Sequence, residues 1–231
     1  MNAQIVIVTG SEPLDDEVIA ALDPDAVVLA ADGGMDLALA AGLRPSALIG
    51  DCDSVSDEGV AWAKENATVA RHPTDKDRTD TELALAVAVD MRPERLTMVG
   101  GGDRLDHTLA ALGALAARHL TGIPEIDAWW SGQHVDVLHG PGRRTLRLAP
   151  GSTLSLITLG RPCDKVSITG VRWPLEAHRL QPGAGIAVSN EVTDPDGDVA
   201  VSLSSGVVHV FDVPSDAPRD QRSGGRRRRS R

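Results

Sequence analysis

Acidic residues and glycines gather in four short segments in the first half of the chain. Carboxylates are hard oxygen ligands that suit Mg²⁺, and glycine-lined turns let backbone N–H groups approach phosphate oxygens. The segments are DGG at 32–34, GDCDS at 50–54, DKDRTD at 75–80 and GGGDRLDH at 100–107. Each comes shortly after an apolar run, and the pattern indicates a site for a phosphate-bearing ligand and a divalent cation.

Five carboxylates of the second and third segments would repel one another if one rim of the fold held them without a cation. They are Asp51, Asp53, Asp75, Asp77 and Asp80. Mg²⁺ typically uses one or two carboxylates and completes its shell with waters and phosphate oxygens. Lys76 and Arg104 can neutralise a polyphosphate, and a helix N-terminus at Thr79 favours anions. The combination predicts a magnesium–nucleotide site, although the chain has no GxxxxGK[ST] Walker loop.

Each segment alone also has a purely structural interpretation, because Asp and Gly are ordinary turn residues. Thr79 could be only a helix cap, and Asp80 only a first-turn carboxylate that faces the helix dipole. Asp106 could simply begin a helix, His107 could be a hydrogen-bonded framework residue, and Cys52 could be a small buried side chain. The four segments together make these separate interpretations weaker.

Strand-like and helix-like patterns alternate over the first two-thirds of the chain. Apolar runs predict strands at 5–8, 26–30, 47–49, 68–70 and 96–99, and helical patterns lie at 15–22, 35–41, 56–65, 79–91 and 105–120. Thr79 and Glu82 have capping-box spacing. Uniformly apolar strands separated by helices predict a mainly parallel, Rossmann-like sheet covered on both faces, whose ligands bind at the carboxyl ends of the strands.

From about residue 133 onward, short β-rich runs replace the helical patterns. Strands are expected at 135–138, 145–148, 153–159, 165–169, 186–188, 199–203 and 207–211, separated by Pro-Gly and Asp-Gly turns. This spacing predicts a small antiparallel β sandwich or barrel. We therefore expect an α/β catalytic domain at 1–140, a β domain at 141–213 and a disordered Arg-rich tail at 214–231.

Composition excludes several classes of protein. The net charge is −10, and because seven arginines lie at 219–231, the rest of the chain is more acidic still. An acidic body disfavours nucleic acid as a partner and is compatible with bound divalent metal. Two cysteines give no disulfide framework, and neither a signal peptide nor an apolar stretch of membrane-spanning length is evident. We expect a cytoplasmic protein with no membrane partner.

The four segments, in this order and spacing, resemble those of the thiamine pyrophosphokinase family. The resemblance continues through SLITLG at 155–160, GVRWPL at 170–175 and VSNE at 188–191, and covers about residues 5–211. It implies transfer of diphosphate from ATP to the hydroxyl of thiamine with the help of Mg²⁺. It also implies a homodimer in which thiamine lies at the subunit interface beside the β domain.

The resemblance assigns roles to individual residues. Asp51, Asp53 and Asp80 would hold Mg²⁺ and, with Arg104, carry out catalysis. ATP would be surrounded by Asp32, Gly33, Gly34, Lys76, Thr79, Arg104 and Asp106. Ser189 and Asn190 would hydrogen-bond the aminopyrimidine of thiamine. The family commonly has an aromatic residue shortly after this pair, where this chain has Val192 and Thr193, so Trp173 is the candidate that stacks on the substrate.

The implied reaction is in-line attack of the thiamine hydroxyl on the β-phosphorus of ATP, with AMP as the leaving group. Positioning and charge stabilisation would supply most of the catalysis. The proton acceptor stays open among Asp51, Asp53 and Asp77. Three alternatives also stay open: a diphosphokinase for another alcohol such as a pterin, a non-catalytic binding module of the same fold, and an RNA-associated protein that uses the arginine tail.

Overall fold

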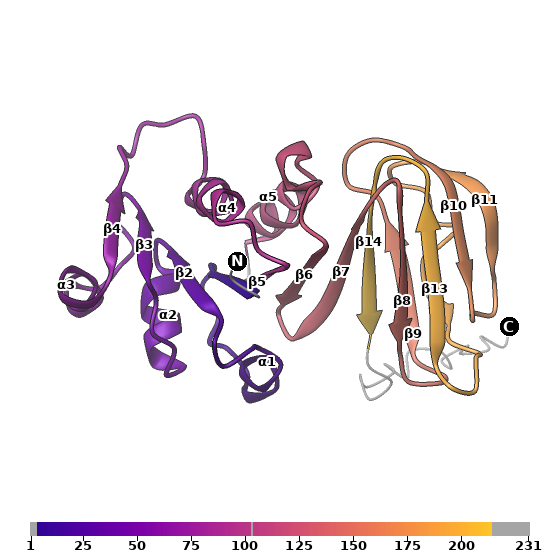
Figure 1. The fold of residues 1–231 in the computed structure, drawn as a ribbon, viewed down its shortest axis with the longest axis horizontal. Coiled ribbons are helices and arrows are strands. Elements are labelled where there is room, and N and C mark those ends of the chain that lie inside the picture. The colour runs from indigo at the N-terminus through magenta and orange to yellow at the C-terminus, as the bar shows by residue number, and fades with distance from the viewer. Residues whose placement is uncertain (1–3, 103, 214–231) are drawn as a thin grey trace, which may run out of the picture.

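A computed structural model describes residues 4–102 and 104–213. The first half forms an α/β layer around parallel strands (Figure 1). These strands are β1 (Gln4–Val8), β2 (Val27–Ala31), β3 (Ala47–Gly50), β4 (Thr68–Arg71), β5 (Arg95–Gly100) and β6 (Glu125–Trp130). They lie in the order β6-β5-β1-β2-β3-β4. The doubly covered parallel sheet expected from the uniformly apolar strands is therefore confirmed.

Helices cover both faces of this sheet and bury its apolar side chains. They are α1 (Asp16–Ala20), α2 (Gly34–Ala40), α3 (Asp57–Asn66), α4 (Asp80–Asp90), α5 (Leu105–Ala114) and the 3₁₀ helix η1 (Arg118–Leu120). Leu85 of α4 and Leu112 of α5 pack with Ile5 and Leu96 on one face. Val18 of α1 packs on the opposite face.

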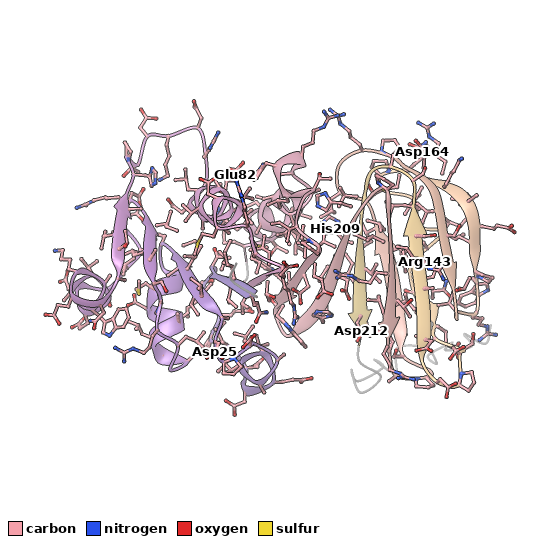
Figure 2. The ribbon with its side chains drawn as sticks, in the orientation of Figure 1. Asp25, Glu82, Arg143, Asp164, His209 and Asp212 are labelled. Carbon is pink, nitrogen blue, oxygen red and sulfur yellow. The ribbon has the colours of Figure 1, made fainter. Side chains whose placement is uncertain are left out.

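The capping box at the start of α4 forms as the sequence predicts. The Thr79 hydroxyl accepts from the backbone N–H of Glu82 at 3.2 Å, and the Glu82 carboxylate accepts from the Thr79 backbone N–H at 2.9 Å. This exchange satisfies two backbone donors that a helix N-terminus would otherwise leave unpaired. Glu82 lies at the exposed beginning of the helix in Figure 2. The helix start therefore fixes the position of Asp80 beside it.

The single helix expected at 105–120 is wrong in its second half. Helix α5 ends at Ala114, and the next turns tighten into i to i+3 bonds such as Ala116 N to Gly113 O at 3.0 Å. Ala117 then adopts an extended conformation before η1. Propensity favours a continued helix through this Ala-rich stretch, but the chain must turn here to enter β6.

The second half is a β sandwich. Its strands are β7 (Gln133–His139), β8 (Gly142–Arg147), β9 (Thr153–Ile157), β10 (Cys163–Thr169), β11 (Leu175–Leu180), β12 (Asn190–Glu191), β13 (Asp198–Leu203) and β14 (Val207–Val213). One layer has the order β12-β9-β14-β7 and the other β11-β10-β13-β8. Side chains such as Leu156, Ile168, Val201 and Val208 fill the space between the layers.

Several expectations about strands are corrected by the structure. Strands β6 and β11 and the two-residue β12 were not predicted, and the strand expected at 186–188 is a turn. Acidic residues interrupt the apolar pattern of β6, and acidic and basic residues interrupt that of β11, whereas Ile186 and Val188 are apolar but 54% and 44% exposed. Apolar character alone therefore misled the assignment in both directions.

The first layer of the sandwich continues the parallel sheet without a break. Strand β6 pairs parallel with β5 and antiparallel with β7, and β7 pairs with β14. Ten strands thus form one sheet that runs across both halves of the chain (Figure 1). His209 of β14, labelled in Figure 2, is fully buried and donates to the backbone oxygen of Leu112 in α5 at 2.9 Å. This bond ties the sandwich to the helical layer.

Across residues 4–102 and 104–213, none of the helices combines the length and the apolar character that a membrane crossing requires.

Candidate active site

Three aspartates meet at the carboxyl ends of neighbouring parallel strands. Asp32 directly follows β2, Asp51 directly follows β3, and Asp80 begins α4. One carboxylate oxygen from each lies within 4.8 Å of the others. This is the edge at which open α/β sheets bind their ligands. We call Asp32, Asp51 and Asp80 the carboxylate cluster.

Gly50 makes the close approach within the cluster possible. Its φ is +151°, a backbone conformation that residues with side chains rarely adopt. A Cβ atom here would lie 3.1 Å from Asp80 Cγ and 3.2 Å from Asp32 Cβ. The glycine that ends β3 therefore leaves the space that two of the carboxylate side chains occupy.

Lys76 reaches into the cluster from the loop before α4. Its Nζ lies 3.3 Å from Asp51 Oδ2 and 3.2 Å from Asp80 Oδ1. Burial opposes the charged form of Lys76, but its hydrogen bonds to Asp80 and Asp51 outweigh burial and raise its pKa. Burial likewise opposes ionisation of Asp51, yet the backbone N–H of Asp53 and the Lys76 ammonium lower the pKa of Asp51 overall. Both groups are therefore charged at neutral pH.

Asp32 is the member of the cluster whose pKa is raised, although hydrogen bonds from Ser54 and the Gly33 backbone partly offset the rise. Its backbone has a φ of +46°, and its Oδ1 is buried with no hydrogen-bond partner among the described residues. Burial is the main cause that raises the pKa of Asp32, and the neighbouring charge of Asp80 raises it further. A buried oxygen without a partner beside two other carboxylates suits a cation.

Asp53, predicted as a metal ligand, lies outside the carboxylate cluster. It is exposed, and its carboxylate accepts from the Ser54 hydroxyl at 2.9 Å. Its backbone N–H donates to Asp51 Oδ1 at 3.3 Å. Sequence reasoning placed Asp32 with the nucleotide and not with the metal. The adjacency of β2 and β3, which pair Ala31 with Ile49, is the signal that could have joined Asp32 to Asp51.

Several residues assigned to ATP also have clear structural roles. A Cβ on Gly34 would collide with the backbone oxygen of Val8, so this glycine lets α2 pack on β1. A Cβ on Gly33 would lie 3.3 Å from the backbone oxygen of Ser54. Thr79 uses its hydroxyl in the capping box. These contacts hold the loops that follow β2 and β3 at the edge of the sheet. The DGG segment lies at the start of α2.

Arg104 and Asp106 lie together at the start of α5. Arg104 Nε and Nη2 donate to the two oxygens of Asp106 at 2.9 and 2.7 Å, and both side chains are exposed. This bidentate pairing is the main cause that holds the pKa of Asp106 far below its usual range. Asp103, the other acid of this segment, lies outside the described residues. The pair places an exposed guanidinium beside the glycine segment that follows β5.

Sequence reasoning missed a contribution from the end of β1. Gly10 has a φ of +93°, and a Cβ there would collide with the backbone of Gly101 after β5. The Thr9 hydroxyl, one residue earlier, lies 3.0 Å from the Thr81 hydroxyl of α4. The Thr-Gly pair directly after an apolar strand was the available signal. These contacts bring the ends of β1 and β5 and the start of α4 to one place.

The residues expected to bind the second substrate lie in the sandwich. Ser189 is exposed with a φ of +57°, and its backbone N–H donates to Ser155 Oγ at 3.0 Å. Asn190 is 2% exposed, whereas Trp173 is 53% exposed. The guanidinium carbon of Arg172 lies 5.0 Å from the centre of the Trp173 ring. Trp173 therefore presents a broad aromatic surface next to a cation.

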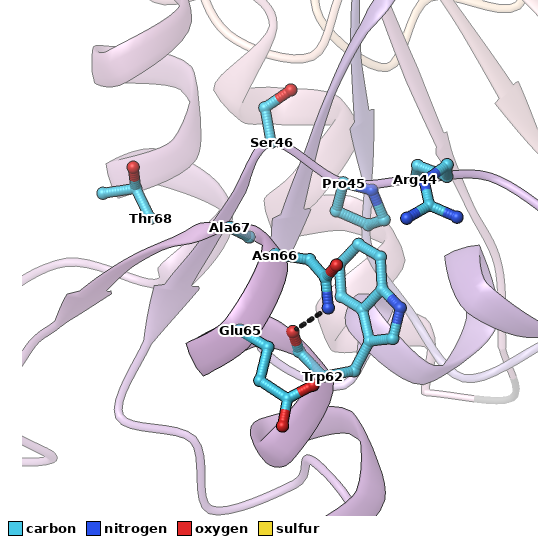
Figure 3. A pocket seen from close by; sticks show the side chains of 8 residues that line it. All are labelled: Arg44, Pro45, Ser46, Trp62, Glu65, Asn66, Ala67 and Thr68. Carbon is cyan, nitrogen blue, oxygen red and sulfur yellow. Dashed lines mark hydrogen bonds between the residues drawn. The ribbon is translucent and has the colours of Figure 1, made fainter.

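A separate surface pocket of about 420 Å³ lies at the amino ends of β3 and β4 (Figure 3). It is lined by residues 44–46, 62 and 65–68, and Arg44 lies over the Trp62 ring at 5.6 Å. The carboxylate cluster follows the carboxyl ends of the same sheet. The pocket and the cluster therefore belong to opposite edges.

A parallel sheet with carboxylates at its carboxyl edge, continued by a β sandwich, defines an α/β protein whose site suits a metal-bound polyphosphate. Family models agree with this class. The thiamin pyrophosphokinase catalytic domain matches residues 20–124, and the thiamin pyrophosphokinase vitamin B1 binding domain matches residues 143–208. The chain belongs to the thiamin pyrophosphokinase family.

Individual relatives extend over most of the chain. A curated protein of Bacillus subtilis (strain 168), thiamine pyrophosphokinase, is 25% identical over 207 residues, which are 88% of this chain and 94% of that protein. A crystal structure of the thiamine pyrophosphokinase from Bacillus subtilis aligns with a TM-score of 0.74 at 23% identity, over 90% of this chain and 98% of that one. Thiamin pyrophosphokinase from Candida albicans aligns with a TM-score of 0.73 at 12% identity, over 91% of this chain and 90% of that one. These structures share the fold described above.

Proposed function

We propose that this chain transfers the diphosphate group of ATP to the hydroxyl of thiamine and releases thiamine diphosphate and AMP. One observation carries the proposal: the segment matched by the catalytic-domain model brings Asp32, Asp51 and Asp80 to the carboxyl edge of its sheet. The chain is thus a transferase of the thiamine diphosphokinase type. The match of residues 143–208 to the vitamin B1 binding domain supports thiamine as the acceptor.

The cation of this site is proposed to be Mg²⁺. The donors of the carboxylate cluster are all oxygens, and the unpartnered Asp32 Oδ1 is one that a cation would satisfy. Asp51 and Asp80 would hold the ion together with Asp32, and Asp53 is adjacent in the same loop. When bound, Mg²⁺ offsets negative charge on phosphate oxygens.

The chain's own cations and N–H groups would position the phosphates. Lys76 is charged and already lies within 3.3 Å of two cluster carboxylates, so it can contact a phosphate at the same edge. Arg104 can exchange its exposed partner Asp106 for phosphate oxygens, because a guanidinium binds both in the same bidentate way. Gly33 and Gly34 would line the nucleotide at the start of α2. Placement of the reactants in line then supplies much of the rate enhancement.

An ionised carboxylate at this edge would accept the proton of the attacking hydroxyl. Asp51 meets this requirement, since its pKa is lowered by the Asp53 N–H and by Lys76. Asp53 and Asp77 are also exposed at the edge loops. In the sandwich, the exposed Ser189 and Trp173 would contact the thiamine rings. Asn190 follows Ser189 in the chain and is hydrogen-bonded to the backbone of Trp173. The acidic body favours approach of a cationic substrate.

The proposed assembly is a homodimer with thiamine at the subunit interface. Two faces of the monomer expose large apolar side chains. On α5, Leu105 and Leu109 are 69% and 52% exposed at helical i, i+4 spacing, and on the sandwich Ile186 and Val188 lie in an exposed turn. Contiguous exposed apolar surface marks protein–protein contacts, and these two places are where we propose that the subunits meet. We further propose the functional division at 1–140 and 141–213, and a cytoplasmic location where ATP is available.

Chromatography of a reaction with ATP, MgCl₂ and thiamine tests the function. Equal amounts of AMP and thiamine diphosphate, absent when Mg²⁺ is left out, are expected. AMP release with a pterin alcohol but not with thiamine would overturn the acceptor. Absence of turnover with any alcohol would favour a binding module. Sedimentation of the purified chain tests the dimer, and a monomer at assay concentration would contradict the shared site.

A further inference from the structure

The side-chain amide of Asn190 makes three hydrogen bonds, two of which hold the backbone of Trp173. Asn190 Oδ1 accepts from the backbone N–H of Trp173 at 3.0 Å and from the backbone N–H of Glu191 at 3.0 Å. Its Nδ2 donates to the backbone oxygen of Trp173 at 2.7 Å. Two N–H donors and one carbonyl acceptor fix which atom is oxygen and which is nitrogen.

These bonds leave Asn190 little capacity for a ligand. An amide oxygen has two lone pairs, and both are used here. One N–H remains, on a residue that is only 2% exposed. Ser189, by contrast, is exposed, and within the described part of the chain nothing is hydrogen-bonded to its hydroxyl. The neighbouring residues therefore differ in what they can offer to a substrate.

Trp173 depends on this attachment because its own side chain is anchored weakly. The indole is 53% exposed and contacts the Arg172 guanidinium at 5.0 Å. Arg172 is itself held from the same strand as Asn190, since its Nη1 pairs with Glu191 Oε2 at 3.0 Å and its backbone N–H donates to the Glu191 oxygen at 2.9 Å. The short strand β12 thus fixes both the backbone and the cationic neighbour of Trp173.

We propose that Asn190 is a positioning residue: it orients the exposed Trp173 indole for the substrate instead of contacting the substrate itself. This inference takes the identity of the substrate, thiamine, from the proposed function. The hydrogen bonds between Asn190 and Trp173 do not depend on that function. It reassigns the direct polar contact to Ser189. A planar, cationic ring system is the kind of ligand that an exposed indole held in place binds best.

The test compares Asn190→Asp with Ser189→Ala in the full-length protein. The Asp variant keeps both acceptor bonds and loses the donor to the Trp173 oxygen, so it should loosen the segment. We expect the KM for thiamine to rise about tenfold, while kcat and the KM for ATP stay within about twofold. Ser189→Ala should also raise the KM for thiamine.

A spectroscopic readout in the ligand-free protein separates positioning from contact. Acrylamide quenching of Trp173, obtained by subtracting the signal of matched Trp173→Phe variants, should increase in Asn190→Asp and stay unchanged in Ser189→Ala. Unchanged quenching in Asn190→Asp together with a raised KM would overturn the proposal in favour of direct contact. This readout needs no turnover, so it remains decisive if the wild-type protein is inactive with thiamine.

Asn190→Ser provides a second variant in case the Asp variant does not fold. Its hydroxyl can restore at most part of the bonding, and an intermediate increase in Trp173 quenching is expected. If both Asn190 variants lose the wild-type circular dichroism while Ser189→Ala retains it, Asn190 supports the whole sandwich and the proposal fails.

Discussion

Replacement of Gly50 by alanine tests whether the carboxylate cluster is the catalytic centre. The backbone at Gly50 has a φ of +151°, and a side chain in such a conformation costs about 1–3 kcal/mol of the free energy of unfolding. The new Cβ would also lie 3.1 Å from Asp80 Cγ and Oδ1, closer than carbon and oxygen normally approach. Either the end of β3 or the Asp80 carboxylate must move by some tenths of an ångström.

A displacement of this size should reduce turnover strongly. Misplacement of a catalytic group by about 1 Å can cost about 10²-fold, so we expect kcat to fall about tenfold or more. The assay is AMP release at saturating ATP, thiamine and Mg²⁺, accompanied by urea unfolding. The Mg²⁺ concentration for half-maximal rate should also rise, because Asp80 and Asp32 are the displaced groups.

Gly42→Ala is the matched control for backbone strain. Gly42 has a φ of +75°, but no atom lies within 4 Å of a Cβ placed there. This variant should lose about 1–2 kcal/mol of unfolding free energy and keep its kcat. If Gly50→Ala behaves like Gly42→Ala, with wild-type kcat and metal dependence, the cluster is not the site of the reaction.

Three further outcomes are expected. Asp80→Asn should lower kcat about 10²-fold at saturating Mg²⁺, whereas Asp53→Asn, outside the cluster, should lower it less; equal losses in an AMP-release assay would contradict this ranking. Burial lowers the pKa of His209 to about 4, below its ordinary value of 6.5. The neutral imidazole therefore contributes fully to the free energy of unfolding above pH 6.5, and this contribution declines as the pH falls toward 4. Urea unfolding should show about 2 kcal/mol of this loss between pH 7 and pH 5, and His209→Gln should lack that component; an identical pH dependence in the variant would refute the assignment. ATP with Mg²⁺ at 100 times its Kd should stabilise the wild-type protein by about 2.7 kcal/mol, a gain that EDTA and Asp80→Asn should reduce; no change in the unfolding midpoint would argue against binding at this edge.

The sequence allowed much of the parallel sheet to be predicted, together with the edge at which the carboxylates gather. Strands β1 to β5 are short apolar runs, and the capping box of Thr79 and Glu82 marks the start of α4. The local sequence pattern and the structure therefore agree for these elements. Asp51 and Asp80 were selected because several carboxylates close to predicted strand ends and a helix start are hard to explain separately, and the structure brings these two side chains together. Asp32 was selected for a different role, since only the pairing of β2 with β3 shows that it faces Asp51.

Other features depend on contacts between distant segments. Strand β6 contains Asp127, which is 2% exposed and accepts from the Thr97 hydroxyl at 2.7 Å and from Arg95. A buried aspartate looks like a surface residue until its partners on β5 are known. The role of Asn190 was also hidden, because its partner Trp173 lies 17 positions away on another loop.

The ten-stranded sheet also sets the order in which the molecule can be completed. Strand β14, the last strand among the described residues, lies between β7 and β9, so β7 has no partner on that side until residues 207–213 are available. Residues up to the end of β7 emerge from the ribosome before residues 207–213 are made, and during that interval one edge of β7 is unpaired. Such edges attract other chains and promote aggregation. We therefore expect a translation pause between β7 and β14, or a shortage of chaperones during that interval, to increase aggregation more than a pause before β7 is made.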